Sequence, residues 1–221
     1  MINLKYFDIE TVDENTFHQL LNLFPVNFHA EICKYVFLED KVRCLLGKMM
    51  VFSAYLEDSY TSADFVANWY RDENNKPHIT GWKAFNISHS GKYVVYAETS
   101  ENTLFGIDIE WIDRNIEIEE LTAFFCQEEQ DFILGHQQGR SDAFFNVWTR
   151  KEALLKASGI GIVDGLNQCN CLRSDFHWRS NKWTIFSPDF HDPDYKLHIA
   201  YSTDNVTHIP VAVTEFLIGA K

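Results

Sequence analysis

One short segment, Leu104–Glu110, limits what this chain can fold into more than any other. Its apolar and acidic residues alternate, which predicts a β-strand with Asp108 and Glu110 on one face and two isoleucines on the other. The flanking residues are also apolar, so the strand is not a fully solvated edge. The chain must therefore pack a core against one face of this strand while two carboxylates stay together on the other.

The rest of the chain mixes helical and strand patterns. In a helix expected at residues 39–56, apolar residues recur on one stripe, and Arg43 and Lys48 fall off it. The other expected elements are a polar loop at 70–83, a strand at 85–88 followed by a turn at 89–91, a strand at 93–99, helices at 119–136 and 142–158, and strands at 195–202 and 208–218. Ser141 is the expected N-cap of the helix at 142–158, and Gly159 and Gly161 end it. Strands and helices without strict alternation predict an α+β fold.

Size and charge exclude several classes of protein. The chain has 221 residues, 46% of them hydrophobic, enough for one large domain or two small ones, and the only visible seam lies near residues 100–103. A net charge of −13 argues against nucleic acids and anionic membrane surfaces as partners. No apolar run approaches the ~20 residues of a transmembrane helix. The five cysteines, an odd number, fit reduced thiols in a cytoplasm.

The paired carboxylates of the first segment need a counter-charge. Asp108 and Glu110 repel each other and raise each other's pKa unless something positive lies between them. No Lys or Arg occurs from Thr103 to Asp113, so a divalent cation such as Mg²⁺ is the natural answer, because it binds one or two carboxylates together with substrate phosphates. The alternative is an edge strand that exposes two solvated acids.

A second group of polar residues lies on the helix expected at 142–158. Trp148, Glu152 and Lys156 are spaced at i, i+4 and i+8 and share one face, with Lys151 and Leu155 beside them. Glu152 can bind a metal or take a proton, and Lys156 can neutralise charge that develops on a phosphate. The alternative is an ordinary Glu–Lys pair on a helix surface.

A third group is the turn expected after the strand at 85–88. Ser88-His89-Ser90-Gly91 offers hydroxyls, an imidazole and backbone N–H groups, which suit an anion such as a phosphate. A plain polar turn is the alternative, and a serine hydrolase is poorly supported because the chain has no Gly-x-Ser-x-Gly elbow. There is no Walker loop and no Gly-x-Gly-x-x-Gly, and Cys169-Asn170-Cys171 is not a zinc knuckle.

The order and spacing of the three groups resemble the signatures of the Sfp-type 4′-phosphopantetheinyl transferases. The matching segments are Asn86–Gly91, Gly106–Glu110 and Trp148–Lys156, and the last continues into Gly159-Ile160-Gly161. Arg43 and the dipeptide Lys76-Pro77 fit the same pattern. The likeness runs from about residue 34 to residue 161, and the remaining C-terminal residues match only in general character.

The resemblance implies a fold and a reaction. The fold consists of two similar α/β subdomains, residues 1–102 and 103–221, related by a pseudo-two-fold with the active site in the cleft between them. The reaction moves 4′-phosphopantetheine from coenzyme A to a serine of an apo acyl or peptidyl carrier protein and releases adenosine 3′,5′-bisphosphate. A monomer is expected, because the pseudo-dimer supplies both walls of the cleft. Fatty-acid, polyketide and peptide-synthetase carriers are all open as acceptors.

The resemblance also implies the residues of a metal site. Asp108, Glu110 and Glu152 would hold Mg²⁺ together with the pyrophosphate of coenzyme A. Lys156 would contact that pyrophosphate and offset the charge on the leaving group. The carrier serine is a poor nucleophile near its normal pKa, so Glu152 or a metal-bound water would take its proton.

Coenzyme A would meet a second set of residues. Ser88 and His89 would contact the 3′-phosphate, and Lys76, followed by Pro77, would lie near the adenine and the 3′-phosphate. The basic residues expected at coenzyme A are Arg43, Lys76, Lys151 and Lys156. All four lie outside residues 101–135, which carry −9 of the net charge of −13.

Some positions depart from the family pattern. The stretch Phe28–Glu31 lacks the basic residues that family members often have there, and Lys34 is the nearest cation. Cys44 stands where a hydroxyl residue is often found, and Glu129 corresponds to a glutamate that either acts in the site or supports its helix. These departures leave a non-catalytic scaffold that binds coenzyme A or a carrier as the alternative. A Mg²⁺-dependent hydrolase of a pyrophosphate compound is the third reading.

Overall fold

The chain forms two compact units in a computed structural model that describes residues 1–160, 166–205 and 208–218. The N-terminal unit comprises Asn3–Thr99 and the described residues from Ala212 onward. The C-terminal unit comprises Met1–Ile2 and Ser100–Val211. Residues after 211 thus belong with the N-terminal unit, whereas the sequence boundary at 102/103 assigns them to the C-terminal subdomain.

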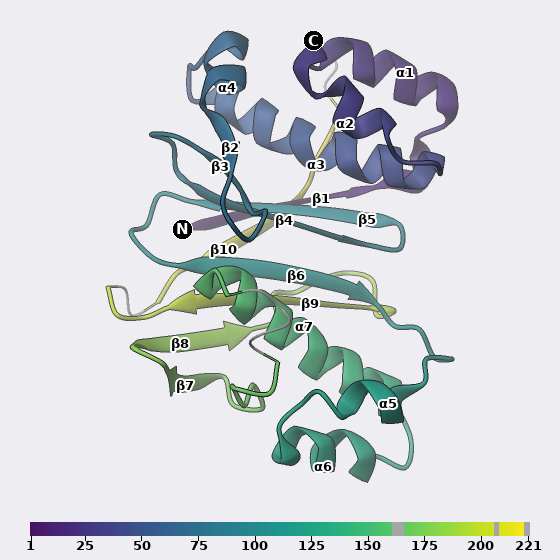
Figure 1. The fold of residues 1–221 in the computed structure, drawn as a ribbon, viewed down its shortest axis with the longest axis vertical. Coiled ribbons are helices and arrows are strands. Elements are labelled where there is room, and N and C mark those ends of the chain that lie inside the picture. The colour runs from purple at the N-terminus through teal and green to yellow at the C-terminus, as the bar shows by residue number, and fades with distance from the viewer. Residues whose placement is uncertain (161–165, 206–207, 219–221) are drawn as a thin grey trace. The chain divides into compact units, whose positions relative to one another are not determined.

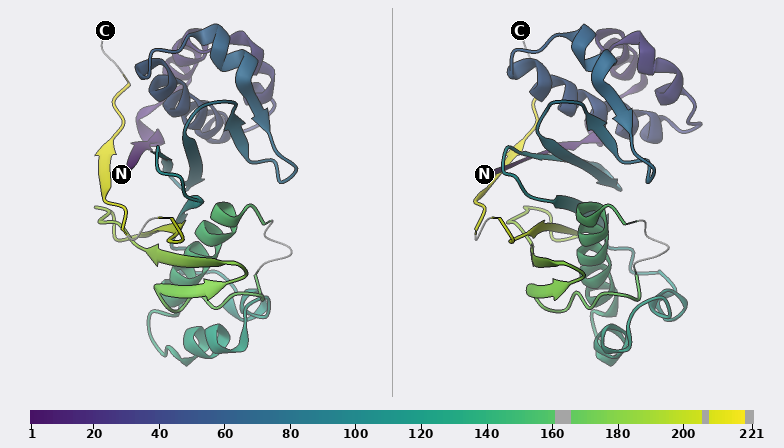
Figure 2. Two further views of the ribbon diagram at one scale, coloured as in Figure 1. Left: turned by 90° about the vertical axis from the view of Figure 1, so that its left-hand side faces the viewer. Right: turned by 60° about the vertical axis from the view of Figure 1, so that its left-hand side comes forward.

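The N-terminal unit is built on a four-stranded sheet in the order β10-β1-β5-β4. These strands are β1 (Ile2–Asp8), β4 (Ala84–Ser90), β5 (Tyr93–Thr99) and β10 (Val211–Glu215). The yellow strand β10 runs beside the purple strand β1, so the last strand of the chain pairs with the first (Figure 2). A separate antiparallel hairpin joins β2 (Trp69–Arg71) to β3 (Pro77–Ile79).

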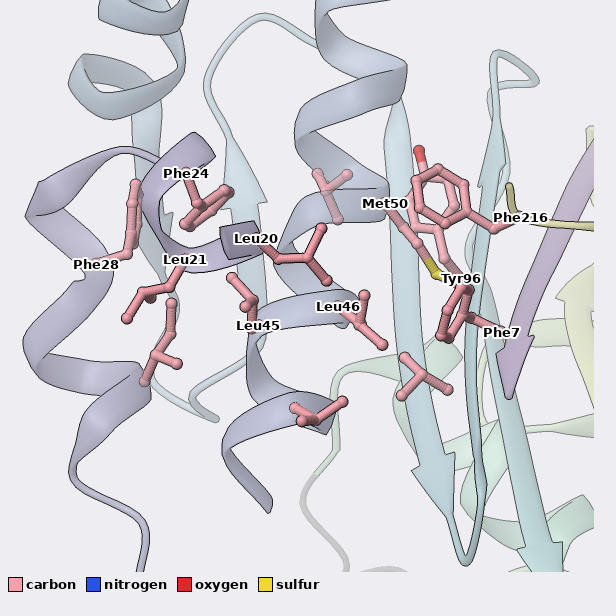
Figure 3. Packing of buried hydrophobic residues seen from close by; sticks show 14 of the residues in the cluster. Phe7, Leu20, Leu21, Phe24, Phe28, Leu45, Leu46, Met50, Tyr96 and Phe216 are labelled. Carbon is pink, nitrogen blue, oxygen red and sulfur yellow. The ribbon is translucent and has the colours of Figure 1, made fainter. Parts of the chain in front are cut away.

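Helices cover this sheet and close its core. They are α1 (Glu14–Leu23), α2 (His29–Cys33), α3 (Leu38–Glu57) and α4 (Ser62–Asn68), with 3₁₀ turns η1 (Ile9–Thr11) and η2 (Val26–Phe28). The stripe expected on the helix at 39–56 is buried, because Leu45, Leu46 and Met50 of α3 pack among aromatic rings that include Tyr96 and Phe216 (Figure 3). Burial of this stripe leaves the other face of α3 available to polar side chains.

The C-terminal unit has a second four-stranded sheet, in the order β6-β9-β8-β7. Its strands are β6 (Phe105–Trp111), β7 (Asp175–Trp178), β8 (Asn181–Phe186) and β9 (Tyr195–Ser202), and all of its neighbours are antiparallel. The helices are α5 (Ile118–Thr122), α6 (Gln127–Gly135) and α7 (Arg140–Ser158), and α7 packs along β6 and β9 (Figure 1). The mixture of helices and antiparallel strands confirms the α+β class.

Two helices differ from the sequence expectations. The single helix expected at 119–136 is broken, because Cys126 has an extended backbone and caps α6, with Glu129 Oε2 accepting its N–H at 3.3 Å. Helix α7 begins one residue before Ser141, so Gly139 in a left-handed conformation takes the cap position. Gly159, also left-handed, ends α7 as expected, whereas Gly161 lies outside the described residues.

Two strand regions also differ. Strand β4 continues through Ser90, so the turn lies at Gly91 and Lys92 rather than at 89–91. The loop expected at 70–83 contains the β2–β3 hairpin, whose polar tip includes Asn75 with a φ of 64°. Within the described residues, no helix has the length and apolar character needed to cross a bilayer.

Candidate active site

A glycine allows strand β6 and helix α7 to approach each other closely. A Cβ added at Gly106 would lie 2.4 Å from the Ala153 carbonyl oxygen and 2.5 Å from the Ala157 nitrogen. No larger residue fits there without a backbone shift, since such distances are far below van der Waals contact. The close approach places Glu152 and Lys156 of α7 against the acidic face of β6.

The two carboxylates of β6 have different partners. Asp108 is buried, and the Lys156 ammonium donates to its Oδ1 at 2.7 Å. Glu110 is half-buried at the end of the strand, where Trp148 Nε1 donates to its Oε1 at 3.3 Å. The structure therefore brings Asp108, Glu110, Trp148 and Lys156 together from two elements about 40 residues apart in sequence.

Glu152 completes this group, and its charge is poorly compensated. Burial, followed by the charges of Asp108 and Glu110, raises the pKa of Glu152 to about 7, although Lys156 acts in the opposite direction. Its Oε1 is buried and accepts no hydrogen bond from the described residues. We call Asp108, Glu110, Glu152 and Lys156 the carboxylate cluster. At neutral pH this cluster can hold or release a proton, or accept a cation.

Lys151 does not belong to this cluster. Its side chain is fully buried on another face of α7, where its ammonium lies 2.7 Å from Glu129 Oε2 and donates to the Cys169 carbonyl at 2.5 Å. The side chain has no exposed surface in this structure, so contact of Lys151 with coenzyme A stays a prediction that this burial does not favour. Glu129 supports the packing of α6 against α7, which was one of the two roles left open for it.

The N-terminal unit holds a cavity of about 420 Å³ that is lined by several of the predicted residues. Arg43, His89 and Pro77 line it, as does Lys34. Arg43 is held in place by bonds from Nε and Nη2 to the Gly91 carbonyl, at 2.9 and 2.6 Å, and from Nη1 to Asp40 at 2.8 Å.

Two predicted residues are placed differently. Because β4 continues through Ser90, Ser88 and His89 point to opposite faces of the strand. His89 is exposed at the cavity, whereas Ser88 is buried, so the structure does not bring the two side chains together, and their contact with one phosphate stays a prediction. Lys76 is half-buried in the β2–β3 hairpin, next to Pro77, and its N–H donates to Asp72 Oδ1 at 2.9 Å.

Sequence reasoning missed two cations at this cavity. Lys48 and Arg71 bind the same oxygen, Glu31 Oε1, at 3.2 and 2.7 Å, and both line the cavity. Lys48 is only 4% exposed and also lies over the Trp69 ring. The position of Lys48 off the apolar stripe of α3 was a usable signal, whereas nothing in the sequence joins Arg71 to Glu31. The cavity thus holds several cations around two carboxylates, with Lys48 and Arg71 at Glu31 and Arg43 at Asp40.

Comparison with known proteins agrees with these features. The family model described as 4′-phosphopantetheinyl transferase superfamily matches residues 104–214, and the model described as 4′-phosphopantetheinyl transferase, N-terminal, matches residues 11–101. The chain is 30% identical to 4′-phosphopantetheinyl transferase psf-1 of Bacillus pumilus over 210 residues, which cover 90% of this chain and 87% of psf-1.

Two further relatives agree. The chain is 28% identical to 4′-phosphopantetheinyl transferase gsp of Aneurinibacillus migulanus over 207 residues, covering 90% of this chain and 85% of gsp. It is 32% identical to 4′-phosphopantetheinyl transferase Sfp of Bacillus subtilis strain 168 over 161 residues, covering 71% and 68% of the two chains. Because the superfamily model matches half of the chain and psf-1 is similar along most of its length, this chain belongs to the 4′-phosphopantetheinyl transferase superfamily.

Proposed function

We propose that this chain transfers 4′-phosphopantetheine from coenzyme A to a serine of an apo carrier protein, with Mg²⁺ as cofactor. The transferase class comes from the family, whereas the metal, the acceptor serine and the residue roles are our proposal. The carboxylate cluster carries it, since three carboxylates and one lysine converge from β6 and α7. Such a set can bind a cation and a pyrophosphate together.

The chemistry of the cluster fits Mg²⁺. The three side chains offer only oxygen donors, and Glu152 Oε1 is buried without a hydrogen bond from the described residues. The raised pKa of Glu152 reflects its burial first and then the negative charges of Asp108 and Glu110. Asp108, Glu110 and Glu152 would hold the ion, which would supply Lewis-acid polarisation of the pyrophosphate. As the described side chains stand, no three His, Cys, Asp or Glu residues are grouped to hold a metal, so these side chains must reorient on binding.

The protein residues then have separate roles. Glu152 is the carboxylate that would take the proton of the carrier serine as that oxygen attacks the β-phosphate, and its pKa of about 7 describes the site without a metal. Lys156, released from Asp108, offsets the charge that develops on the departing adenosine 3′,5′-bisphosphate. A metal-bound water remains the alternative proton acceptor.

The cavity of the N-terminal unit is suited to the phosphorylated adenosine end of coenzyme A. Arg43 and His89 line it, and Lys48 and Arg71 add two cations that the sequence did not reveal. Glu31 binds both of them in the structure and offsets part of their charge. These cations lower the pKa of its carboxyl, although burial opposes this. A phosphate entering the cavity would compete with Glu31 for them.

A panel of carriers tests this proposal. Purified protein is incubated with Mg²⁺, coenzyme A and apo carriers of the fatty-acid, polyketide and peptide-synthetase types, and the carriers are weighed by mass spectrometry. We expect at least one carrier to gain one phosphopantetheine on serine, and EDTA to prevent the gain. Coenzyme A binding without turnover on any carrier would instead support the scaffold, and bisphosphate release without a carrier would support the hydrolase.

A further inference from the structure

Behind the carboxylate cluster lies a second group of reactive side chains that the proposed transfer does not use. Cys169 and Cys171 are 3% and 0% exposed, and their sulfur atoms lie 3.8 Å apart. The Lys151 ammonium lies 3.8 Å from Cys169 Sγ. Cys169 Sγ therefore receives hydrogen bonds from both a thiol and an ammonium.

This environment distinguishes the two thiols chemically. The hydrogen bond from Cys171, with the nearby charge of Lys151, lowers the pKa of Cys169 against the effect of burial. Burial raises the pKa of Cys171 well above its usual value. Cys126, the third thiol nearby, donates to Glu129 at 3.2 Å, and burial raises its pKa to about 11. Since the thiolate is the nucleophile and the Lys151 ammonium donates to the sulfur of Cys169, Cys169 is the reactive member of the group.

The backbone of the segment is tied down on both sides. The Cys171 N–H donates to Glu129 Oε1 at 2.8 Å, and its carbonyl accepts from Arg150 Nε at 2.6 Å. The Cys169 carbonyl accepts from Lys151. The two side chains are therefore held as neighbours, and only the sulfur atoms need to move for a bond of about 2.05 Å to form.

We propose that Cys169 and Cys171 are a redox-active dithiol that an oxidant of the peroxide class converts into an intramolecular disulfide. The Cys169 thiolate attacks one oxygen of hydrogen peroxide, the O–O bond breaks, and the departing hydroxide takes up the proton released by Cys169. The Cys171 sulfur then attacks the Cys169 sulfenic acid, the S–O bond breaks, and the hydroxyl leaves as water with the Cys171 proton. Two electrons pass from the thiols to one peroxide, which becomes two waters.

Thiol mapping on the full chain tests this site. The folded protein is treated with hydrogen peroxide and quenched with catalase, and it is then unfolded in denaturant, alkylated and digested, so that the alkylating reagent reaches buried thiols as well as exposed ones. We expect the peptide that contains residues 169–171 to lose two hydrogens and both alkylation sites, and dithiothreitol to restore them. In Cys171→Ser the reaction should stop at a Cys169 sulfenic acid that dimedone traps, whereas Cys33→Ser, an exposed thiol, should leave the disulfide unaffected.

The proposal is overturned if, after peroxide treatment of the folded wild-type protein and subsequent unfolding, both thiols are still alkylated while Cys33 is oxidised. It is equally overturned if Cys169 or Cys171 is found bonded to another cysteine. The wild-type peptide decides the question even where a serine variant fails to fold. This test does not depend on transferase activity, so its outcome is independent of the proposed function.

Discussion

Two adjacent residues of α7 have opposite electrostatic environments. Lys151 and Glu152 are both buried, but the charge of Lys151 is matched by Glu129 at 2.7 Å and by the carbonyl of Cys169. Burial raises the pKa of Glu152 to about 7, together with the negative charges of Asp108 and Glu110. A buried charge with a complete set of partners serves to hold segments together, whereas one without them stores energy that a ligand can release.

The largest expected effect comes from removing the buried ion pair between Lys151 and Glu129. Lys151→Met leaves the Glu129 carboxylate buried without its ammonium, so we expect the free energy of unfolding to fall by about 3–5 kcal/mol. Urea denaturation monitored by circular dichroism measures this. The double variant Glu129→Gln/Lys151→Met should recover most of the loss, since no lone charge remains. A loss below ~1 kcal/mol in the single variant would contradict the assignment.

Removing the carboxylate of Glu152, whose charge is poorly compensated, should lower the rate of the reaction rather than the stability of the fold. Glu152→Gln keeps the shape of the side chain but removes the proposed metal ligand and proton acceptor. We therefore expect kcat/KM for carrier modification to fall by a factor equivalent to ~2–4 kcal/mol of transition-state stabilisation. The control is Glu120→Gln, which removes an exposed acid from α5. Near-wild-type turnover in the Glu152 variant would show that another group performs its role.

Glu152→Gln should also change how the free energy of unfolding depends on pH, because the buried carboxylate of Glu152 destabilises the fold when it is ionised. The folded pKa of Glu152, about 7, lies above its model value of 4.5, so its contribution to stability is present below pH 4.5 and is lost as pH rises through 7. Without metal, Glu152→Gln should therefore gain on the order of 2 kcal/mol relative to wild type between pH 5 and pH 8. Parallel denaturation curves at both pH values would show this, and an equal difference at both would refute it.

Moving β6 away from α7 should disturb the surroundings of both Lys151 and Glu152, with a moderate loss of stability and activity. Gly106→Ala forces β6 away from Ala153 and Ala157, so we expect about 1–3 kcal/mol of lost stability together with reduced turnover. The matched control is Gly135→Ala, where an added Cβ meets nothing within 4 Å. Equal stability of the two variants, measured by thermal unfolding, would mean that the close approach is not required.

The smallest effect is expected at Glu31 in the N-terminal unit, a paired carboxylate that is less buried than Glu129 and Glu152. Glu31 compensates Lys48 and Arg71 at a site that is partly open to solvent. Because Glu31 competes with an incoming phosphate, Glu31→Gln should bind coenzyme A a few-fold more tightly, worth less than about 1 kcal/mol. Calorimetry measures this affinity. Weaker binding would show instead that Glu31 holds the two cations in a productive position.

Local sequence patterns predicted most residues of the site, but they misplaced element ends and side chains that depend on tertiary packing. Strands β5 and β9 and the long helix α3 agree with their apolar periodicity to within a residue. The split between α5 and α6 was missed, because it depends on a cap formed by Cys126 and Glu129 rather than on the hydrophobic pattern. The resemblance implied that Ser88 and His89 meet one phosphate, and the turn pattern placed the end of the strand two residues too early, since β4 continues through Ser90.

The sequence alone was enough to identify the acidic strand, the helix spacing of Trp148, Glu152 and Lys156, and the resemblance that these imply. It did not distinguish Lys151 from Lys156 as a partner of the carboxylates, since both are basic residues on the same helix. The tertiary structure decided this. Successive residues of a helix are rotated by about 100°, and the partners of the two faces come from distant parts of the chain, Glu129 and Cys169 for one and β6 for the other.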